Sequence, residues 1–134
     1  ASRGADAGGQ PGVKPVIHSY DERREYYFRE GCHINELSNS ADDAAVSIAR
    51  ARVEPGRATR WHRLRGITER YVILQGRGRV EIGRELAHSV GPGDVVVIPP
   101  KTRQRITNED TEDLVFLAIC SPRFLPEAYE DLES

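Results

Sequence analysis

Residues 55–76 read PGRATRWHRLRGITERYVILQG, and this stretch decides the fold. It opens with a Pro-Gly pair typical of a turn and continues through two short runs rich in β-branched and aromatic residues. His62 and Glu69 are side chains that can exchange protons or bind a metal, and Leu64 follows two positions after the histidine. The stretch therefore predicts two strands that carry a polar site resembling a metal site with one ligand replaced by leucine.

The chain around this stretch repeats the pattern of short apolar runs and turns. Gly, Pro, Asn or Asp stands at nearly every break, at intervals of roughly ten residues. No stretch has the length and the 3.6-residue periodicity of a crossover helix, which argues against a parallel α/β sheet. The expected strands are CHINEL, VSIARARV, TRWHRL, ERYVILQG, GRVEIG, DVVVIPP, QRITN and DLVFLAIC. This pattern predicts an all-β sandwich or barrel.

The two ends of the chain differ from the middle. Residues 1–12 contain little to bury, so we expect a flexible tail, followed by one domain over residues 13–134 with its core at about 32–122. The short apolar pieces between residues 13 and 28 predict an N-terminal arm that packs on something larger. In PRFLPEAYEDLES a proline precedes a short amphipathic piece, which predicts a C-terminal helical turn.

Composition limits the partners and the compartment. The chain has 134 residues, 19 Lys and Arg against 21 Asp and Glu, and a net charge of −2, so we expect neither a nucleic-acid partner nor a membrane partner. No apolar run approaches the roughly 18 residues of a membrane span. The two cysteines, Cys32 and Cys120, do not make a disulfide scaffold, which favours reduced thiols in the cytoplasm.

Two spaced strings of residues resemble a known family. The strings contain Gly56, His62, Leu64, Glu69 and Gly76, and then Gly93, Pro99, Lys101, Gln104 and Asn108. Their spacing resembles the cupin motifs G-x5-H-x-H-x3-4-E-x6-G and G-x5-P-x-G-x2-H-x3-N, and the 16 residues between them are similar to the gap in small single-domain bacterial cupins. The resemblance implies the cupin double-stranded β-helix, a jelly-roll barrel.

Three positions depart from the cupin pattern. Leu64 and Gln104 stand where the motifs have histidines, and Lys101 stands where the second motif has a turn glycine. By the resemblance, the residues at 62, 64, 69 and 104 would hold a metal. His62, Glu69 and Gln104 still offer donors acceptable to Fe, Mn, Ni or Zn, so they are the candidate ligands of one divalent ion. Without the second and third histidines, the affinity should fall well below that of a complete site.

The same side chains also allow metal-free interpretations. They can form a buried hydrogen-bonded cluster, or His62 and Glu69 can act as an acid/base pair beside a substrate carbonyl. Tyr71 shares a strand face with Glu69 and is a candidate to assist catalysis, with a core tyrosine as the alternative. Leu64 and Gln104 would then contribute an apolar wall and a polar contact to a ligand pocket.

Arginines surround the expected mouth of the barrel. Arg60 shares the parity of His62, so it is the candidate to bind a carboxylate or phosphate of the ligand. The others, Arg63, Arg65, Arg103 and Arg105, are expected on a solvated face. Arg50 and Arg52 alternate with alanines, which predicts that these two arginines point outward or toward a partner subunit.

The remaining histidines and cysteines have weaker signals. Cys32 and His33 are adjacent, so on a strand they face opposite sides and cannot line one pocket. We therefore expect Cys32 and Cys120 to be core residues rather than nucleophiles. No role is assigned to His18 or His88.

Two functional hypotheses follow from these residues. The first is a small enzyme acting on a polar metabolite, for example a sugar-phosphate isomerase or epimerase, or a metal-dependent dioxygenase; the resemblance does not choose among them. The second is a ligand-binding or sensing module that has lost catalysis together with two histidines. The retained His62 and Glu69 favour the enzyme. Open β edges and the aromatic arm residues Tyr26, Tyr27 and Phe28 predict a homodimer.

Overall fold

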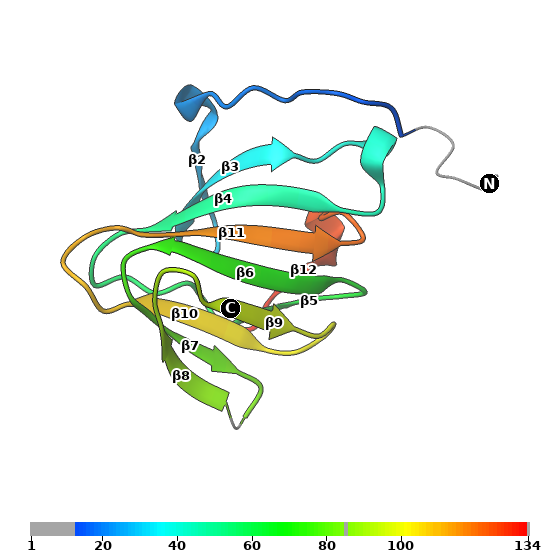
Figure 1. Ribbon diagram of the computed structural model, residues 1–134. Helices are drawn as coiled ribbons and strands as arrows, with labels where there is room; N and C mark the ends of the chain where they lie inside the picture. Colours follow the sequence, from blue (N-terminus) through cyan, green and yellow to red (C-terminus); the bar gives the residue numbers. More distant parts are fainter. Residues whose placement is uncertain (1–12, 85, 134) are drawn as a thin grey trace.

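Strands between short turns build the computed structural model, which describes residues 13–84 and 86–133 (Figure 1). Across these residues there is no α-helix, only the short 3-10 turns η1 (Glu22–Arg24), η2 (Ala41–Asp43) and η3 (Pro126–Ala128). No helix of this part is long and apolar enough to cross a membrane. The all-β class is confirmed, whereas the expected tail at 1–12 lies outside the described residues.

Two antiparallel sheets form the molecule. The six-stranded sheet has the order β2 (Tyr26–Phe28), β3 (Cys32–Ser38), β4 (Ser47–Val53), β11 (Leu114–Ser121), β6 (Thr68–Gln75), β9 (Val95–Ile98). The five-stranded sheet has the order β12 (Tyr129–Asp131), β5 (His62–Leu64), β10 (Gln104–Asn108), β7 (Gly78–Ile82), β8 (Leu86–Val90). Strands far apart in sequence, such as β4 and β11, are neighbours in space, as in a jelly roll (Figure 1).

Alternation along each strand separates an inner face from an outer face. On β6, Glu69, Tyr71 and Ile73 are buried, while their neighbours on the other face are half-buried or exposed. On β10, Gln104 and Ile106 are buried in the same alternating way. The period of two that predicted these strands therefore also decides which side chains enter the space between the sheets.

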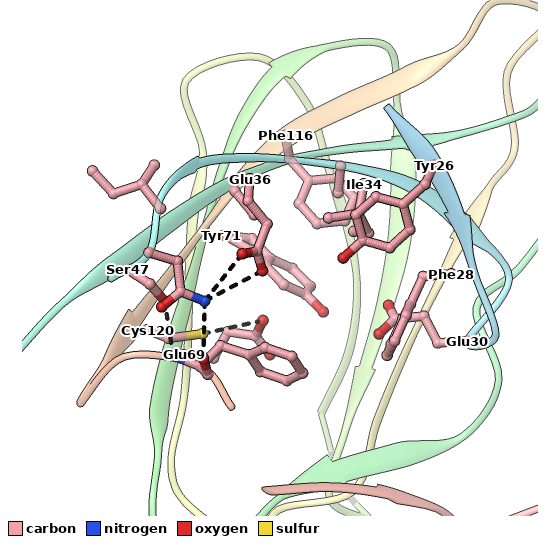
Figure 2. A pocket seen from close by; sticks show the side chains of 16 residues that line it. Tyr26, Phe28, Glu30, Ile34, Glu36, Ser47, Glu69, Tyr71, Phe116 and Cys120 are labelled. Carbon is pink, nitrogen blue, oxygen red and sulfur yellow. Dashed lines mark hydrogen bonds between the residues drawn. The ribbon is translucent and has the colours of Figure 1, made fainter. Parts of the chain in front are cut away.

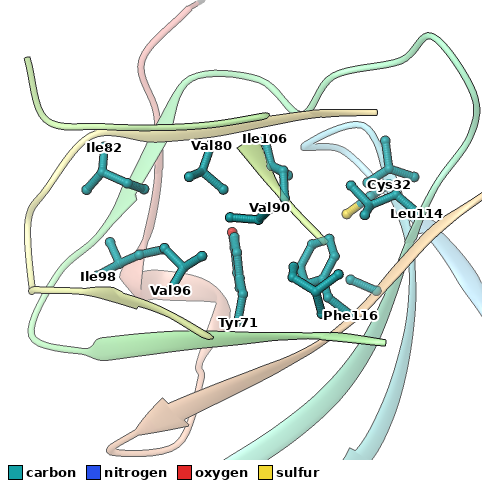
Figure 3. Close-up of a cluster of buried hydrophobic side chains, with 13 residues drawn as sticks. Cys32, Tyr71, Val80, Ile82, Val90, Val96, Ile98, Ile106, Leu114 and Phe116 are labelled. Atoms are coloured by element: carbon teal, nitrogen blue, oxygen red, sulfur yellow. The ribbon is translucent and has the colours of Figure 1, made fainter. Parts of the chain in front are cut away.

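An apolar core occupies one part of that space. Its largest members include Ile73, Ile98, Ile106, Leu114 and Phe116, which are at most 1% exposed (Figure 3). Tyr71 joins this cluster through its ring, whose centroid lies 4.4 Å from that of Phe116. These side chains come from both sheets, so burying them fastens the two layers together.

Backbone geometry explains two motif positions. Gly76 has φ +83°, and a Cβ there would lie 2.7 Å from the carbonyl oxygen of Asp113, so a larger residue would clash with the backbone. Lys101, which replaces the glycine of the second motif, has φ +60°. The lysine thus adopts the left-handed conformation that the glycine would reach without strain.

Some expected strands differ from the observed ones. The strand expected over residues 59–64 shortens to β5, because the backbone of Arg60 donates a hydrogen bond to the Glu30 carbonyl (2.7 Å) instead of joining the ladder. The strands β2, β8 and β12 were not expected. The predicted C-terminal helical turn is present as η3, and it leads directly into β12.

The N-terminal arm packs on its own chain. Glu25 lies 2.7 Å from Arg52 and 3.5 Å from Arg50, so both arginines of β4 face a carboxylate of the arm. The Phe28 ring packs edge-on against Phe124 and Tyr129, with centroid distances of 6.3 and 5.2 Å. The N-terminal arm was expected to pack on something larger, and it packs on the sheets of its own chain. The homodimer stays a prediction.

Candidate functional site

Three buried polar side chains lie beside the apolar core. His62 on β5, Glu69 on β6 and Gln104 on β10 are 1%, 8% and 1% exposed, and Gln104 is the register partner of His62. Their positions on the inner faces agree with the alternation expected from the sequence. Both sheets contribute to the cluster, because β6 belongs to one sheet and β5 and β10 to the other.

A chain of hydrogen bonds holds Glu69 in place. The Tyr71 hydroxyl donates to Oε1 of Gln104 at 2.6 Å, and Nε2 of Gln104 donates to Oε1 of Glu69 at 3.1 Å. On the other side, the Cys120 thiol donates to Oε2 of Glu69 at 3.8 Å. Each of these donors is buried, so the carboxyl group is fixed by partners on two further strands.

The surroundings of Glu69 make it a group that titrates near neutrality. Burial, followed by the negative charge of Glu30, raises the pKa of Glu69 to about 7. His62 and the hydrogen bonds from Gln104 and Cys120 oppose this shift without cancelling it. A carboxyl group with this pKa can both accept and release a proton at neutral pH.

The imidazole of His62 is oriented by its own backbone and by an aromatic ring. Nδ1 donates to the carbonyl oxygen of Arg60 at 2.6 Å, and the ring stacks on Tyr129 with a centroid distance of 5.3 Å. This contact places a proton on Nδ1, so in a neutral imidazole the lone pair lies on Nε2. Nε2 lies 3.8 Å from Oε1 of Glu30, a residue of the turn between β2 and β3.

A pocket opens next to Glu69 on the inner side of the six-stranded sheet (Figure 2). This space, which we call the inner pocket, has a volume of about 50 Å³. Its apolar lining includes Ile34, Ala51, Phe116 and Ala118. Three carboxylates also line it, those of Glu30, Glu36 and Glu69. Tyr71 lines the pocket, whereas His62, Gln104 and Leu64 do not.

The inner pocket continues into a wider groove of about 540 Å³. The residues shared by the two spaces are Tyr26, Phe28, Glu36, Asn39 and Phe124. The groove adds Arg24, from η1, and Arg123, from the segment after β11. A ligand that spans both spaces would therefore meet these two arginines in the groove, and Glu30 and Glu69 only in the inner pocket.

The predicted metal donors take part in hydrogen bonds within the protein, and the metal site stays a prediction. Gln104 uses both ends of its amide, because its oxygen accepts from Tyr71 and its nitrogen donates to Glu69. Leu64 supplies no donor, and no group of three His, Cys, Asp or Glu side chains that could hold a metal occurs in the described part of the chain. A metal at the predicted site would have to share the oxygen of Gln104 with the Tyr71 hydroxyl.

The structure corrects the location predicted for Arg60 and Leu64. Arg60 Nε lies 3.0 Å from a carboxylate oxygen of Asp131 on β12, away from the pocket. Because the strand begins only at His62, the alternation that would have turned Arg60 inward does not reach it. Leu64 is buried, but it packs in a separate cluster with Ile67, Cys120 and Tyr129.

The other arginines lie on the outer surface, as expected. Arg63 pairs with Glu130 of β12 at 2.7 Å. Arg103 and Arg105 lie over the ring of Trp61, at 3.8 and 4.6 Å from its centroid. Their side chains are thus occupied by contacts within the chain.

Both cysteines are buried thiols beside carboxylates. The Cys32 thiol donates to Oε2 of Glu30 at 3.3 Å, and burial is the main reason that its pKa is raised. Burial, followed by the charge of Glu69, also raises the pKa of Cys120. Both groups therefore remain protonated at neutral pH, which is unfavourable for a nucleophile.

Sequence reasoning missed the residues that complete the pocket. Glu30, Glu36 and Asn39 belong to no motif, and Arg24 and Arg123 lie in segments assigned to the ends of the chain. The parity of β3 was an available signal, because Ile34 and Glu36 share a face and both line the pocket. No such signal marks Glu30, which lies in a turn.

Comparisons with known proteins agree with this architecture. Residues 49–120 match the family model for the cupin domain. An uncharacterized protein of Methanocaldococcus jannaschii, MJ1618, is 33% identical over 123 residues, which cover 90% of this chain and 95% of the relative.

Solved structures with the same fold are more distant in sequence. KdgF from Halomonas sp. has a TM-score of 0.71 at 17% identity, covering 81% of this chain and 96% of that one. Pac13, described as a nucleoside dehydratase, has a TM-score of 0.70 at 17% identity, with 87% and 92% coverage. An oxalate decarboxylase from Lactobacillus farciminis has a TM-score of 0.69 at 22% identity, covering 81% of this chain and 33% of the decarboxylase. Together with the two motifs and the jelly-roll sheets, the family match shows that this chain belongs to the cupin family.

Proposed function

We propose that this protein is a small-molecule enzyme that moves a proton to or from a carbon atom next to a carbonyl group, with Glu69 as the proton carrier. One observation supports this above all. Glu69 lines a pocket, is held by Gln104 and Cys120, and has a pKa raised to about 7. General acid/base catalysis is most effective when the pKa of the catalytic group is close to the working pH.

The reaction would begin with ionised Glu69. Its carboxylate takes a proton from the substrate carbon, and the electron pair of the C–H bond moves toward the carbonyl oxygen to give an enolate. For a substrate with a hydroxyl on the reacting carbon, the proton of that hydroxyl moves to the former carbonyl oxygen and protonated Glu69 gives its proton to the former carbonyl carbon, which yields an isomer with the carbonyl at the reacting carbon. For a substrate with a hydroxyl on the next carbon, the enolate re-forms the carbonyl, the C–O bond of that hydroxyl breaks as protonated Glu69 gives it a proton, and water leaves. The second outcome is a dehydration, and the structural neighbour Pac13 is a nucleoside dehydratase.

The neighbours of Glu69 have distinct roles in this proposal. Gln104 is a positioning residue, because it bonds to Glu69 but does not line the pocket. Tyr71 lines the pocket, and its hydroxyl can donate to the enolate oxygen by exchanging its bond to Gln104. His62 Nε2, which faces Glu30, is the second group able to accept a proton. No step passes through a metal.

Exchange with solvent deuterium tests the proposal before the natural substrate is known. A panel of aldoses, ketoses and small oxo acids is incubated with the protein in D2O, and loss of the C–H signal is followed by NMR. We expect exchange in at least one compound, and we expect Glu69→Gln to slow it by about 10²- to 10⁴-fold. The exposed Glu109→Gln variant is the matched control and should exchange like the wild type.

The pH profile adds a second criterion. Because Glu69 must be ionised to act as a base, exchange by the free protein should fall as the pH decreases through about 7. Equal exchange by wild type and Glu69→Gln would contradict the assignment. Loss of exchange on dialysis against a chelator, with recovery on adding a divalent metal, would favour metal chemistry instead.

The sensing-module hypothesis retains one supporting observation. Leu64 and Gln104 replace two histidines of the cupin pattern, and Gln104 is bonded within the protein rather than left free for a metal. A compound that raises the melting temperature but shows neither exchange nor conversion would favour this second function.

A further inference from the structure

The inner pocket is an unusually acidic space. Its charged lining consists of Glu30, Glu36 and Glu69, and in the described residues no Lys, Arg or His side chain lines it. Neutral donors satisfy these carboxylates: the thiol of Cys32 bonds to Glu30, and Gln104 bonds to Glu69.

Glu36 has a neutral donor as well. Nδ2 of Asn39 lies 3.2 and 3.3 Å from its two oxygens. Within the described chain, His62 is the one basic side chain within 4.0 Å of any of these three carboxylates, at 3.8 Å from Glu30. Negative charge is therefore concentrated in the pocket without a lysine or arginine to neutralise it.

The outer groove differs, because it adds two arginines to Glu36, which it shares with the inner pocket. Arg24 and Arg123 line it, and neither has a carboxylate oxygen within 4.0 Å in the described part of the chain. Arg123 Nε donates to Oδ1 of Asn39 at 2.9 Å, and Asn39 in turn donates to Glu36. Nδ2 of Asn39 also donates to the Phe124 carbonyl oxygen at 2.9 Å, so Asn39 lies between the basic groove and the acidic pocket.

The two spaces also differ in size. The inner volume of about 50 Å³ holds about four water-sized groups, because each needs roughly 10–15 Å³. Only the end group of a metabolite fits there, and the rest of the molecule must remain in the groove. A ligand that fills both spaces should therefore carry positive charge at its inner end, beside the carboxylates, and negative charge at its outer end, beside the arginines.

We propose that the ligand of this pocket is a small zwitterion, whose ammonium group enters between Glu30, Glu36 and Glu69 and whose carboxylate or phosphate remains near Arg24 and Arg123. Such a zwitterion would be the substrate class of the proposed enzyme. The inference rests on the proposed function only where it places ligand binding and proton transfer by Glu69 in the same pocket. It assigns the anionic end of the ligand to Arg24 and Arg123 rather than to Arg60, which pairs with Asp131 and does not line the pocket.

An ammonium group suits the inner pocket for two reasons. It has three donors and no acceptor, so it can bond to more than one carboxylate at once. Its positive charge also offsets the repulsion between the carboxylates that line the pocket.

Calorimetric titration with four simple compounds tests the proposal. The probes are γ-aminobutyrate (zwitterion), butylamine (cation), glutarate (dianion) and butanediol (neutral). We expect γ-aminobutyrate to bind most tightly and butylamine about tenfold more weakly, with glutarate and butanediol weaker still. Glutarate or butanediol binding as tightly as γ-aminobutyrate, or no binding of either amine, would overturn the proposal.

Matched variants assign the two ends of the ligand. Glu36→Gln should weaken both amines by about tenfold, whereas Arg123→Gln should weaken γ-aminobutyrate by a similar factor and leave butylamine unchanged. Arg79→Gln, an exposed position on β7, is the control and should alter neither. Unchanged binding of butylamine to folded Glu36→Gln protein would contradict the inner ammonium site.

The outcomes separate this proposal from the proposed reaction. If γ-aminobutyrate binds as expected but no compound exchanges deuterium through Glu69, the ligand class stands and the enzyme does not. If carbonyl compounds exchange through Glu69 while the amines fail to bind, the enzyme stands and the ligand class does not. Melting curves of each variant confirm that the folded protein is being compared.

Discussion

The two ends of the barrel interior are built from the same strands but differ in character. Along the inner face of β6, polar Glu69 is followed by Tyr71 and then by Ile73 in the apolar core. β10 repeats the change with Gln104 and Ile106. One end is filled by aliphatic side chains (Figure 3), and the other is a hollow with carboxylates (Figure 2).

The difference shows how the fold supports a costly site. Burying Glu69 is unfavourable, as its raised pKa indicates, and the hollow beside it removes packing contacts. The apolar end compensates, because its close-packed residues join both sheets and hold the strands that carry the polar residues. Tyr71 lies at the boundary, with its ring against Phe116 and its hydroxyl toward Gln104.

The largest expected effect on stability comes from the apolar end. Ile106 is 1% exposed in the core, so Ile106→Ala should lower the free energy of unfolding by about 2–5 kcal/mol through lost burial and a cavity. Urea denaturation measures this change. Ligand affinity per folded molecule should stay the same, because Ile106 does not line the pocket. If Ile106→Ala lowered stability and also altered ligand affinity, the packing of the apolar core and the binding of ligand in the pocket would not be independent.

The next effect is the pH dependence that Glu69 gives to stability. Its pKa is 4.5 in the unfolded chain and about 7 in the folded protein, so between these values the folded state binds more protons. Stability should therefore fall as the pH rises from about 5 to 7, by up to about 3 kcal/mol, and level off above that range.

Comparison with Glu69→Gln isolates this effect, because the amide does not titrate. The difference in unfolding free energy between wild type and variant should shift in favour of the variant as the pH rises toward 7, and then become constant. Parallel stability curves for the two proteins between pH 5 and 8 would show that the pKa of Glu69 is not raised.

The smallest effect concerns the boundary residue. Tyr71→Phe keeps the ring against Phe116 but leaves Oε1 of Gln104 without its donor, which should cost about 1–3 kcal/mol in unfolding free energy. Thermal and urea denaturation measure it. A neutral substitution would mean that water or another side chain replaces the hydroxyl, and that Tyr71 belongs to the apolar end alone.

The sequence predicted the apolar end better than the hollow end. Most of the core strands appear as apolar runs between turns, since their periodicity is local and their burial follows from it. The strands β2 and β12 have only three residues each, too few to show that periodicity, and they pair with the neighbouring strands β3 and β5. Arg60 shows the same dependence on a distant strand, because its side chain pairs with Asp131 of β12.

By itself, the sequence determined that this chain is a cupin and that His62, Glu69 and Gln104 lie on inward faces. Motif spacing fixes the turns, and the period of two fixes the faces. Only the tertiary structure decided which charges meet there. Glu30 and Glu36 reach the pocket from a turn and from β3, and the arginines stay in the outer groove or on the surface. That arrangement depends on through-space contacts between distant segments, which no local pattern in the sequence encodes.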